Sequence, residues 1–310
     1  MRGLGKETLK LIAFARQLLE RLHPMTLRQL HYAIFSAAKI KYANVDRDYK
    51  RLSYATSIAR RKYRALELTG YSHEFIMGNF SDVIPHDWMV DETREPVTVS
   101  MWDDVQRYLD TVKRSYRRDN WQTQPNYCEV WSEKATVLGS LRPLANELGI
   151  TLRVCKGFAS TGMQMRIGED FELIAKPISV FYVGDHDPSG EDIPRDIHER
   201  GQRASGKDFT IKRLAIHPED IRRFNLPPQE IKDSDARTPG FKRKYGDKAP
   251  TVELDALPVD ELRRRVRDAI QSLIEWDAWD RQVQVQQVEM NCIAEFADRV
   301  KNLPQAPIVG

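Results

Sequence analysis

Two aspartates separated by one residue, Asp185 and Asp187, follow an apolar run that extends from Pro177 to Val183. The run predicts a buried β-strand, and residues i and i+2 of an extended segment point the same way. Both carboxylates should therefore project from the carboxyl end of a strand, where open α/β sheets place their ligands. Close carboxylates repel each other, and a divalent cation such as Mg²⁺, which prefers oxygen ligands, relieves that repulsion. The alternative is a polar turn in which an aspartate only caps the next helix.

A third acidic residue, Glu133, ends another alternating apolar segment, which begins at Tyr127. This segment predicts a second strand, followed by a helix over 135–148. Lys134 comes directly after the glutamate. A glutamate after one strand and a pair of aspartates after another are more specific than an isolated Asp-x-Asp triplet, which is common in proteins.

The two segments together resemble a toprim domain, the metal site of topoisomerases, primases and some nucleases. The most similar variant is that of the topoisomerase VI A subunit and its meiotic relatives, whose acidic motif reads Asp-x-Asp-Pro-x-Gly, as in Asp185 to Gly190. Lys often follows the glutamate of that family. The segment 156–160, which contains Gly157 and Ser160, is similar to its Gly-x-Pro-Ser/Asp turn.

This resemblance covers roughly residues 125–195 in its specific form. It implies that Glu133, Asp185 and Asp187 hold Mg²⁺, for which Mn²⁺ should substitute, and that Glu133 also takes part in catalysis. Lys134 and His186 could assist, although local hydrogen bonds are the favoured role for both. The compact chain suggests the small, free-standing Mini-A type of phages and mobile elements.

The N-terminal region carries a related motif, Thr26-Leu-Arg-Gln-Leu-His-Tyr32. In the same family, a winged-helix domain carries Arg-Asp-x-(Tyr/Phe)-Tyr, and its last tyrosine attacks DNA. Aligning Arg28 with the family's arginine places Tyr32 on this nucleophile, although Gln29 replaces the aspartate and His31 replaces an aromatic residue. Arg28, one helical turn earlier, could stabilise the phenolate or clamp the scissile phosphate. The alternative is that Tyr32 packs on an amphipathic helix.

Positive charge is concentrated at the N-terminus. Residues 1–67 contain 15 Lys and Arg against five Asp and Glu, whereas the whole chain has a net charge of +3. Apolar periodicity predicts helices over 6–22, 27–40 and 46–67, and a helix, a turn and a basic helix are typical of a helix-turn-helix. We expect sequence-independent phosphate contacts from the basic residues of the third helix, with a solvated helix face as the alternative. These residues are Lys50, Arg51, Arg60, Arg61, Lys62 and Arg64.

The expected fold class is α/β, with four parts. They are a helical winged-helix DNA-binding domain over 1–100, a linker helix and connector over 101–124, a toprim domain with a Rossmann-like parallel sheet over 125–260, and a helical C-terminal extension over 261–310. Later in the chain, the pattern predicts a helix over 192–203, a strand over 209–216, a long loop over 232–250 and a helix over 262–294.

A second acidic pair, Glu253 and Asp255, follows the long loop. It could bind a second metal ion or face a DNA channel. A structural turn with Asp255 in solvent is the favoured alternative.

The composition excludes several classes of protein. No apolar run approaches the roughly 18–20 residues of a membrane span, and charges interrupt the apolar N-terminal residues as no signal peptide would allow. We therefore expect no membrane association and a cytoplasmic location. Cys128, Cys155 and Cys292 have no zinc-site spacing, so we expect reduced cysteines in the core.

The sequence thus predicts Mg²⁺-dependent DNA strand cleavage by a type II topoisomerase-like transesterase, with Tyr32 attacking a phosphate of double-stranded DNA. The resemblance implies a homodimer in which one subunit's tyrosine works with the other's metal. Because the chain has no GxxxxGK[ST] motif, ATP-driven strand passage would need a separate ATPase partner. The alternatives are a hydrolytic toprim nuclease, in which metal-bound water replaces Tyr32, and a non-catalytic DNA-binding regulator.

Overall fold

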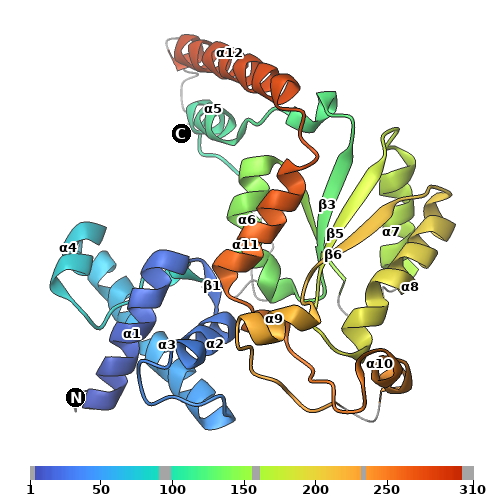
Figure 1. Ribbon diagram of the computed structural model, residues 1–310. Coiled ribbons are helices and arrows are strands. Elements are labelled where there is room, and N and C mark those ends of the chain that lie inside the picture. Colours follow the sequence, from blue (N-terminus) through green and yellow to red (C-terminus); the bar gives the residue numbers. More distant parts are fainter. Residues whose placement is uncertain (1–3, 91–98, 156–160, 232–234, 302–310) are drawn as a thin grey trace.

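The computed structural model describes residues 4–90, 99–155, 161–231 and 235–301 (Figure 1). At its centre lies a sheet of four parallel strands in the order β4-β3-β5-β6. These are β3 (Tyr127–Ser132), β4 (Thr151–Val154), β5 (Ile178–Val183) and β6 (Thr210–Ala215). Helices connect the strands, so the expected α/β class is confirmed.

The register of the two central strands positions the acidic motifs. Ser132 of β3 lies opposite Val183 of β5, so the chain leaves both strands at the same level. Glu133 and Asp185 follow within two residues of this pair and emerge side by side. Both strands are almost entirely buried, as expected for central strands of a covered parallel sheet.

Helices cover both faces of the sheet. In Figure 1, α6 (Ala135–Leu148) and α11 (Val259–Gln271) lie on one side, and α7 (Thr161–Glu172) and α8 (Pro188–Ser205) lie on the other. Val130 belongs to the core on the first side, whereas its neighbour Trp131 belongs to the core on the second. This division follows from the alternation of side chains along a strand.

The N-terminal region is a helical unit with its own core. Its helices are α1 (Lys6–Leu22), α2 (Leu27–Ala37), α3 (Asp46–Leu68) and α4 (His73–Asn79). The three helices predicted within 6–67 are therefore present. Thr26 and Gln29 form a capping box at the start of α2, which fixes where that helix begins. The short strands β1 (Met25–Thr26) and β2 (Met89–Val90) pair in parallel, and η1 (His86–Trp88) precedes β2.

Three boundary predictions are corrected. The predicted loop over 232–250 contains α10 (Thr238–Tyr245), which Phe241 anchors by burying its ring. The helix predicted over 262–294 is two helices, α11 and α12 (Trp276–Lys301). The apolar pattern runs across this break because Ile274, in the connection, is also buried.

The third correction concerns α8, which begins at Pro188 instead of 192. Asp187 caps this helix, and Pro188 occupies its first turn, where a missing N–H carries no cost.

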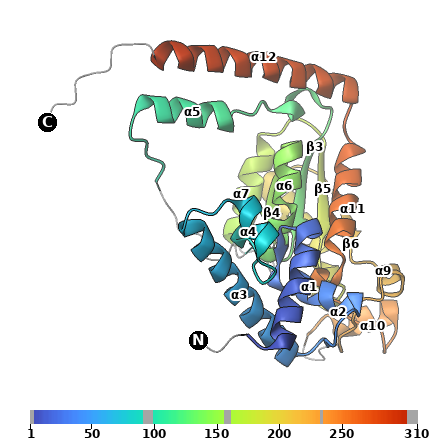
Figure 2. The ribbon, with the colours of Figure 1, turned by 90° about the vertical axis from the view of Figure 1, so that its left-hand side faces the viewer.

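Two helices extend from the sheet region as an arm. Figure 2 shows α5 (Val105–Ser115) and α12 side by side at the top of the molecule. Glu289 of α12 accepts hydrogen bonds from Tyr116 and Arg118, just after α5. Cys128 and Cys155 are buried as expected, but Cys292, on α12, is exposed. The prediction that all three cysteines lie in the core is wrong for Cys292, because only part of the α12 surface is covered.

The remaining short elements are η3 (Asn120–Thr123), α9 (Pro218–Arg223) and η4 (Leu254–Ala256). Within the part of the chain that the structure describes, no helix combines the length and apolar character needed to cross a membrane.

Candidate active site

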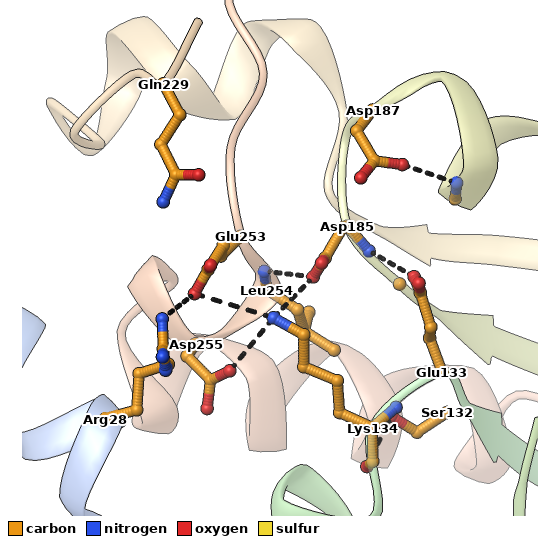
Figure 3. A network of polar contacts seen from close by, with 12 residues as sticks. Arg28, Ser132, Glu133, Lys134, Asp185, Asp187, Gln229, Glu253, Leu254 and Asp255 are labelled. Carbon is orange, nitrogen blue, oxygen red and sulfur yellow. Dashed lines mark hydrogen bonds and ion pairs between the residues drawn. The ribbon is translucent and has the colours of Figure 1, made fainter. Parts of the chain in front are cut away.

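The acidic motifs meet at the carboxyl edge of the sheet. Glu133 follows β3, Asp185 follows β5, and the Asp185 backbone N–H donates to Glu133 Oε2 at 3.3 Å. With Asp187 they line a pocket of about 560 Å³. The structure therefore brings together the three residues that the sequence predicts as metal ligands (Figure 3).

Asp187 both caps a helix and lines the carboxylate pocket. Its Oδ1 accepts a hydrogen bond from Gly190 N at 2.6 Å and so caps α8. The same side chain lines the pocket with Asp185. The capping role that was the alternative interpretation is thus present, and it leaves Oδ2 of Asp187 outside the cap.

Lys134 is the centre of an ion network (Figure 3). Its Nζ lies 3.1 Å from Asp185 Oδ1, 3.2 Å from Asp255 Oδ2 and 3.6 Å from Glu253 Oε2. Burial lowers the pKa of Lys134, but the three carboxylates raise it by more, so the ammonium stays charged. Lys134 therefore does more than make the single local contact favoured from the sequence.

Glu253 and Asp255 join this network through η4. The side chain of Asp255 is only 1% exposed, and its carboxylate contacts Lys134 and accepts from Thr26 Oγ1 at 3.4 Å. The prediction that Asp255 lies in solvent is wrong, because the short helix turns it toward the half-buried Lys134. Leu254, between the two acids, donates its backbone N–H to Asp185 Oδ1 at 2.7 Å.

The α2 motif reaches the same network. Arg28 Nη1 donates to Glu253 Oε2 at 2.7 Å. The Tyr32 hydroxyl donates to the same Glu253 oxygen at 3.3 Å and accepts from Gln229 Nε2 at 3.3 Å. Helical spacing explains why Arg28 and Tyr32, four residues apart, meet one carboxylate. Tyr32 thus contacts the carboxylate cluster of its own chain.

Burial affects the chemistry of Tyr32. The residue is 4% exposed and forms part of the core under the sheet. Burial and the charge of Glu253 raise the pKa of its hydroxyl, while Arg28 acts in the opposite direction. In this arrangement Tyr32 is a weaker nucleophile than a tyrosine in water.

Negative charge exceeds positive charge in the cluster. Five carboxylates surround two cations, Arg28 and Lys134, and the carboxylates are Glu133, Asp185, Asp187, Glu253 and Asp255. Burial, together with the charges of Asp185 and Asp187, raises the pKa of Glu133. Burial also raises the pKa of Asp185, despite the opposing effect of Lys134.

The donor set fits a hard divalent cation, because it offers carboxylate oxygens whose mutual repulsion such an ion would relieve. Glu133, Asp185 and Asp187 would hold it. Among the described residues, no three acidic, His or Cys side chains are gathered as an ion cage. The physical reason is visible in the contacts: Asp185 is turned to Lys134 and Leu254, and Asp187 to the start of α8.

The six basic residues predicted to contact DNA lie on α3 but differ in their surroundings. Four of them form ion pairs with nearby acids, which partly neutralises them: Lys50 with Asp46, Arg51 with Asp48, Lys62 with Asp82 and Arg64 with Glu67. Arg60 and Arg61 have no such partner among the described residues. Of the six, only Arg60 lines one of the described pockets near the cluster.

His186 is buried and held by neighbouring side chains. Its ring is 1% exposed, pairs with Glu191 at 3.3 Å and packs against Phe241 and Tyr245. This agrees with the local role favoured from the sequence. Gly157 and Ser160 lie outside the described residues.

Two site residues were not predicted. Gln229 contacts Tyr32, and Arg213 of β6 donates to the carbonyl oxygens of Gly184, Asp185 and Gly190, which holds the acidic loop in place. Neither residue lies in a recognisable motif. The alternation of β6 could have shown only that Arg213 shares a side of the strand with Ile211.

No known family profile matches the chain, and no curated protein is significantly similar to it.

Proposed function

We propose that this protein cleaves DNA strands with the help of a divalent cation, Mg²⁺ or Mn²⁺. One observation carries the proposal. Three segments far apart in the sequence, around Tyr32, Glu133 and Asp185, meet in one polar cluster at the carboxyl edge of a parallel sheet. A basic helical unit lies beside them, and its charge suits a polyanionic substrate.

Each residue has a role in this proposal. Glu133, Asp185 and Asp187 hold the cation, which when bound stabilises charge on a phosphodiester. Arg28 orients the phosphate through paired N–H donors. Tyr32 supplies the nucleophilic oxygen: the Tyr32–phosphorus bond forms, the bond to the departing 3′-oxygen breaks, and the phenolic proton passes to Glu253, its present acceptor. Water protonates the departing oxygen.

We further propose the assembly that the resemblance implies. The helical N-terminal part would be a winged-helix domain, the sheet region a toprim domain, and the protein a homodimer of the topoisomerase VI A type. In that dimer Tyr32 would leave its own Glu253 and act beside the other subunit's metal, and the equivalent glutamate of that site would accept the phenolic proton. Strand passage would require a separate ATPase partner.

A second candidate is hydrolytic cleavage without a protein–DNA bond. The burial of Tyr32 favours it, because a hydroxyl held by Glu253 and Gln229 and given a raised pKa is poorly prepared to attack. The carboxylates and their cation would then activate water instead.

A supercoiled-plasmid assay separates these candidates. The protein is incubated with DNA and Mg²⁺ or Mn²⁺, stopped with SDS, and analysed with and without proteinase K. Wild type is compared with Tyr32→Phe and Asp185→Ala. The matched controls are Tyr54→Phe, on the exposed side of α3, and Asp277→Asn, on the exposed start of α12.

Protein-linked breaks that disappear in Tyr32→Phe but persist in Tyr54→Phe would support the tyrosine reaction. Free nicks or linear DNA that survive Tyr32→Phe and vanish in Asp185→Ala would support hydrolysis. Cleavage that Asp185→Ala leaves intact would contradict both. DNA binding without cleavage would favour a regulator.

A further inference from the structure

A second pocket lies next to the carboxylate pocket, and two acids of the cluster, Glu253 and Asp255, are among its lining residues. It has a volume of about 510 Å³ and runs between α3 and the start of α6; we call it the α3 groove. One wall is made by Tyr49, Ser53, Ser57 and Arg60 of α3. The rest of the lining includes Arg28 and Lys134 together with their acidic partners Glu253 and Asp255, so three cations face two carboxylates. Glu253 lines both this groove and the carboxylate pocket, so the two spaces adjoin at that residue.

The α3 wall is a stripe of hydrogen-bond donors. Ser53, Ser57 and Arg60 follow at intervals of four and three residues, which places them on one face of the helix. Within the described chain, none of their side chains has a hydrogen-bond or ion-pair partner. Three polar groups that face one groove without partners indicate a polar ligand that accepts hydrogen bonds.

The opposite wall also suits an anion. The helix α6 has 14 residues, and no side chain caps its amino terminus at Lys134. Thr136, in its first turn, lines the groove. Helix amino termini attract negative charge through their unpaired N–H groups and the helix dipole. This observation is independent of the α3 stripe and points to the same kind of ligand.

The positively charged side chains of the groove favour an anionic ligand. Arg28 and Lys134 already contact the acidic side chains Glu253 and Asp255, whereas Arg60 has no acidic partner among the described residues. An anion entering the groove would meet Arg60 first and could then compete with Glu253 for Arg28. Because 46% of the Arg28 side chain is exposed, it can turn from one partner to the other without the cost of unburying it.

We propose that the α3 groove binds a backbone phosphate of duplex DNA through Arg60, Ser53 and Ser57, and that this phosphate takes Arg28 from Glu253. This proposal rests on DNA as the substrate and adds a positioning site next to the carboxylates. Release of Glu253 would couple DNA entry to the state of the cluster, since Glu253 also holds Tyr32 and Lys134.

Equilibrium binding of a short fluorescent duplex, in EDTA and over a range of salt concentrations, tests the groove without any cleavage. Arg60→Gln should weaken binding about tenfold and reduce the salt slope by about one. The double variant Ser53→Ala/Ser57→Ala should weaken it about threefold with an unchanged slope, because no charge is lost. Arg61→Gln is the matched control, because this arginine is one residue away, lies outside the groove lining and has no ion-pair partner in the part of the chain that the structure describes.

A double-mutant cycle tests the exchange of Arg28. Glu253→Gln should strengthen DNA binding about threefold, because Arg28 is freed for phosphate, and this gain should vanish when Arg28→Gln is also present. A gain that persists without Arg28 would show a general charge effect and would overturn the exchange.

The groove proposal would be overturned if Arg60→Gln and Arg61→Gln weakened DNA binding equally, or if neither weakened it. It would also be overturned if the wild type did not bind DNA. The proposed cleavage fails separately. If the protein binds DNA through Arg60 but never cuts it, the groove proposal stands and the cleavage proposal fails. If it cuts DNA, and Arg60→Gln and Arg61→Gln bind DNA equally well, only the groove proposal fails.

Discussion

At the scale of single residues, Lys134 decides how the acidic cluster is held together. Its ammonium is shared by Asp185, Glu253 and Asp255, and the side chain of Asp255 is almost completely buried. A carboxylate in that position is costly without a compensating charge. The lysine therefore stabilises the fold as well as the arrangement of the site.

Replacing Lys134 with methionine should destabilise the protein by about 3 kcal/mol, because a buried ion network loses its cation. The measurement is urea unfolding in EDTA, so that no added metal replaces the ammonium. Lys113→Met is the control. Lys113 pairs at 3.7 Å with Asp298, whose side chain is 73% exposed, so its loss should cost less than about 1 kcal/mol. Equal losses in the two variants would contradict the role given to Lys134.

At the scale of elements, the first turn of α8 packs too closely against the acidic loop for any side chain at Gly190. A Cβ on Gly190 would lie 2.2 Å from the Asp185 carbonyl oxygen and 3.2 Å from Asp187 Oδ1. The glycine therefore lets α8 begin directly against the acidic loop. Arg213 holds the same loop from β6.

Gly190→Ala should destabilise the protein by about 2 kcal/mol, since the new methyl group must displace the backbone of the acidic loop. Gly240→Ala in α10 is the matched control, because a Cβ there meets nothing within 4 Å. By helix propensity alone, that control should be neutral or more stable by up to about 1 kcal/mol. Urea unfolding of both variants measures the difference, and a stabilised Gly190→Ala would refute the packing argument.

A second junction between elements joins α9 to α11. Asp220 accepts from Arg265 Nη1 and Nη2 at 2.8 and 2.6 Å, and from His217 N at 2.8 Å. Burial raises the pKa of Asp220, but these donors lower it by more, so the net pKa falls below its usual value. A carboxyl with a lowered pKa stabilises the folded state above its unfolded pKa of about 3.9, and that contribution disappears as the pH falls through the folded value.

Asp220→Asn should therefore cost about 3 kcal/mol near neutral pH, because Arg265 is left without its buried partner. The difference between variant and wild type should shrink only below about pH 4. Urea unfolding over a series of pH values measures it. Glu219→Gln, on the exposed side of the same helix, should show neither effect. A difference independent of pH down to the acid transition would argue against the ionised pair.

At the scale of the whole molecule, Arg263 joins the N-terminal helices to the sheet region. From α11 it donates to the carbonyl oxygen of Ser140 at 2.9 Å, of Leu22 at 2.9 Å and of Pro24 at 2.7 Å. The contact of Gln29 Nε2 with Ser140 Oγ, at 3.1 Å, lies beside it. These bonds fix α2, and hence Arg28 and Tyr32, relative to the carboxylates.

Arg263→Met should destabilise the protein by about 3 kcal/mol, because several carbonyl groups lose a charged donor. Arg264→Met, at the next position, removes only exposed i,i+3 and i,i+4 ion pairs and should cost less than about 1 kcal/mol. Thermal and urea unfolding of the two variants provide the test. If they are equally stable, Arg263 does not join the two regions.

The sequence by itself determined the local elements and the identity of the acidic residues. The helices over 6–22, 46–67 and 135–148 and the strands before Glu133 and Asp185 follow from apolar periodicity, and Thr26 marks the start of α2 by its capping chemistry. Such signals come from neighbours along the chain, so they need no knowledge of the fold.

Only the tertiary structure decided which partners the charged groups meet. Asp255 is buried because Lys134, 121 residues away, reaches it, and Tyr32 is held by Glu253, 221 residues away. Likewise, α3 carries seven basic residues in its sequence, but only Arg60 of these lines the groove, and serines without a partner among the described residues complete the wall. Contacts between distant segments depend on how whole elements pack, and no periodicity in the sequence encodes that packing.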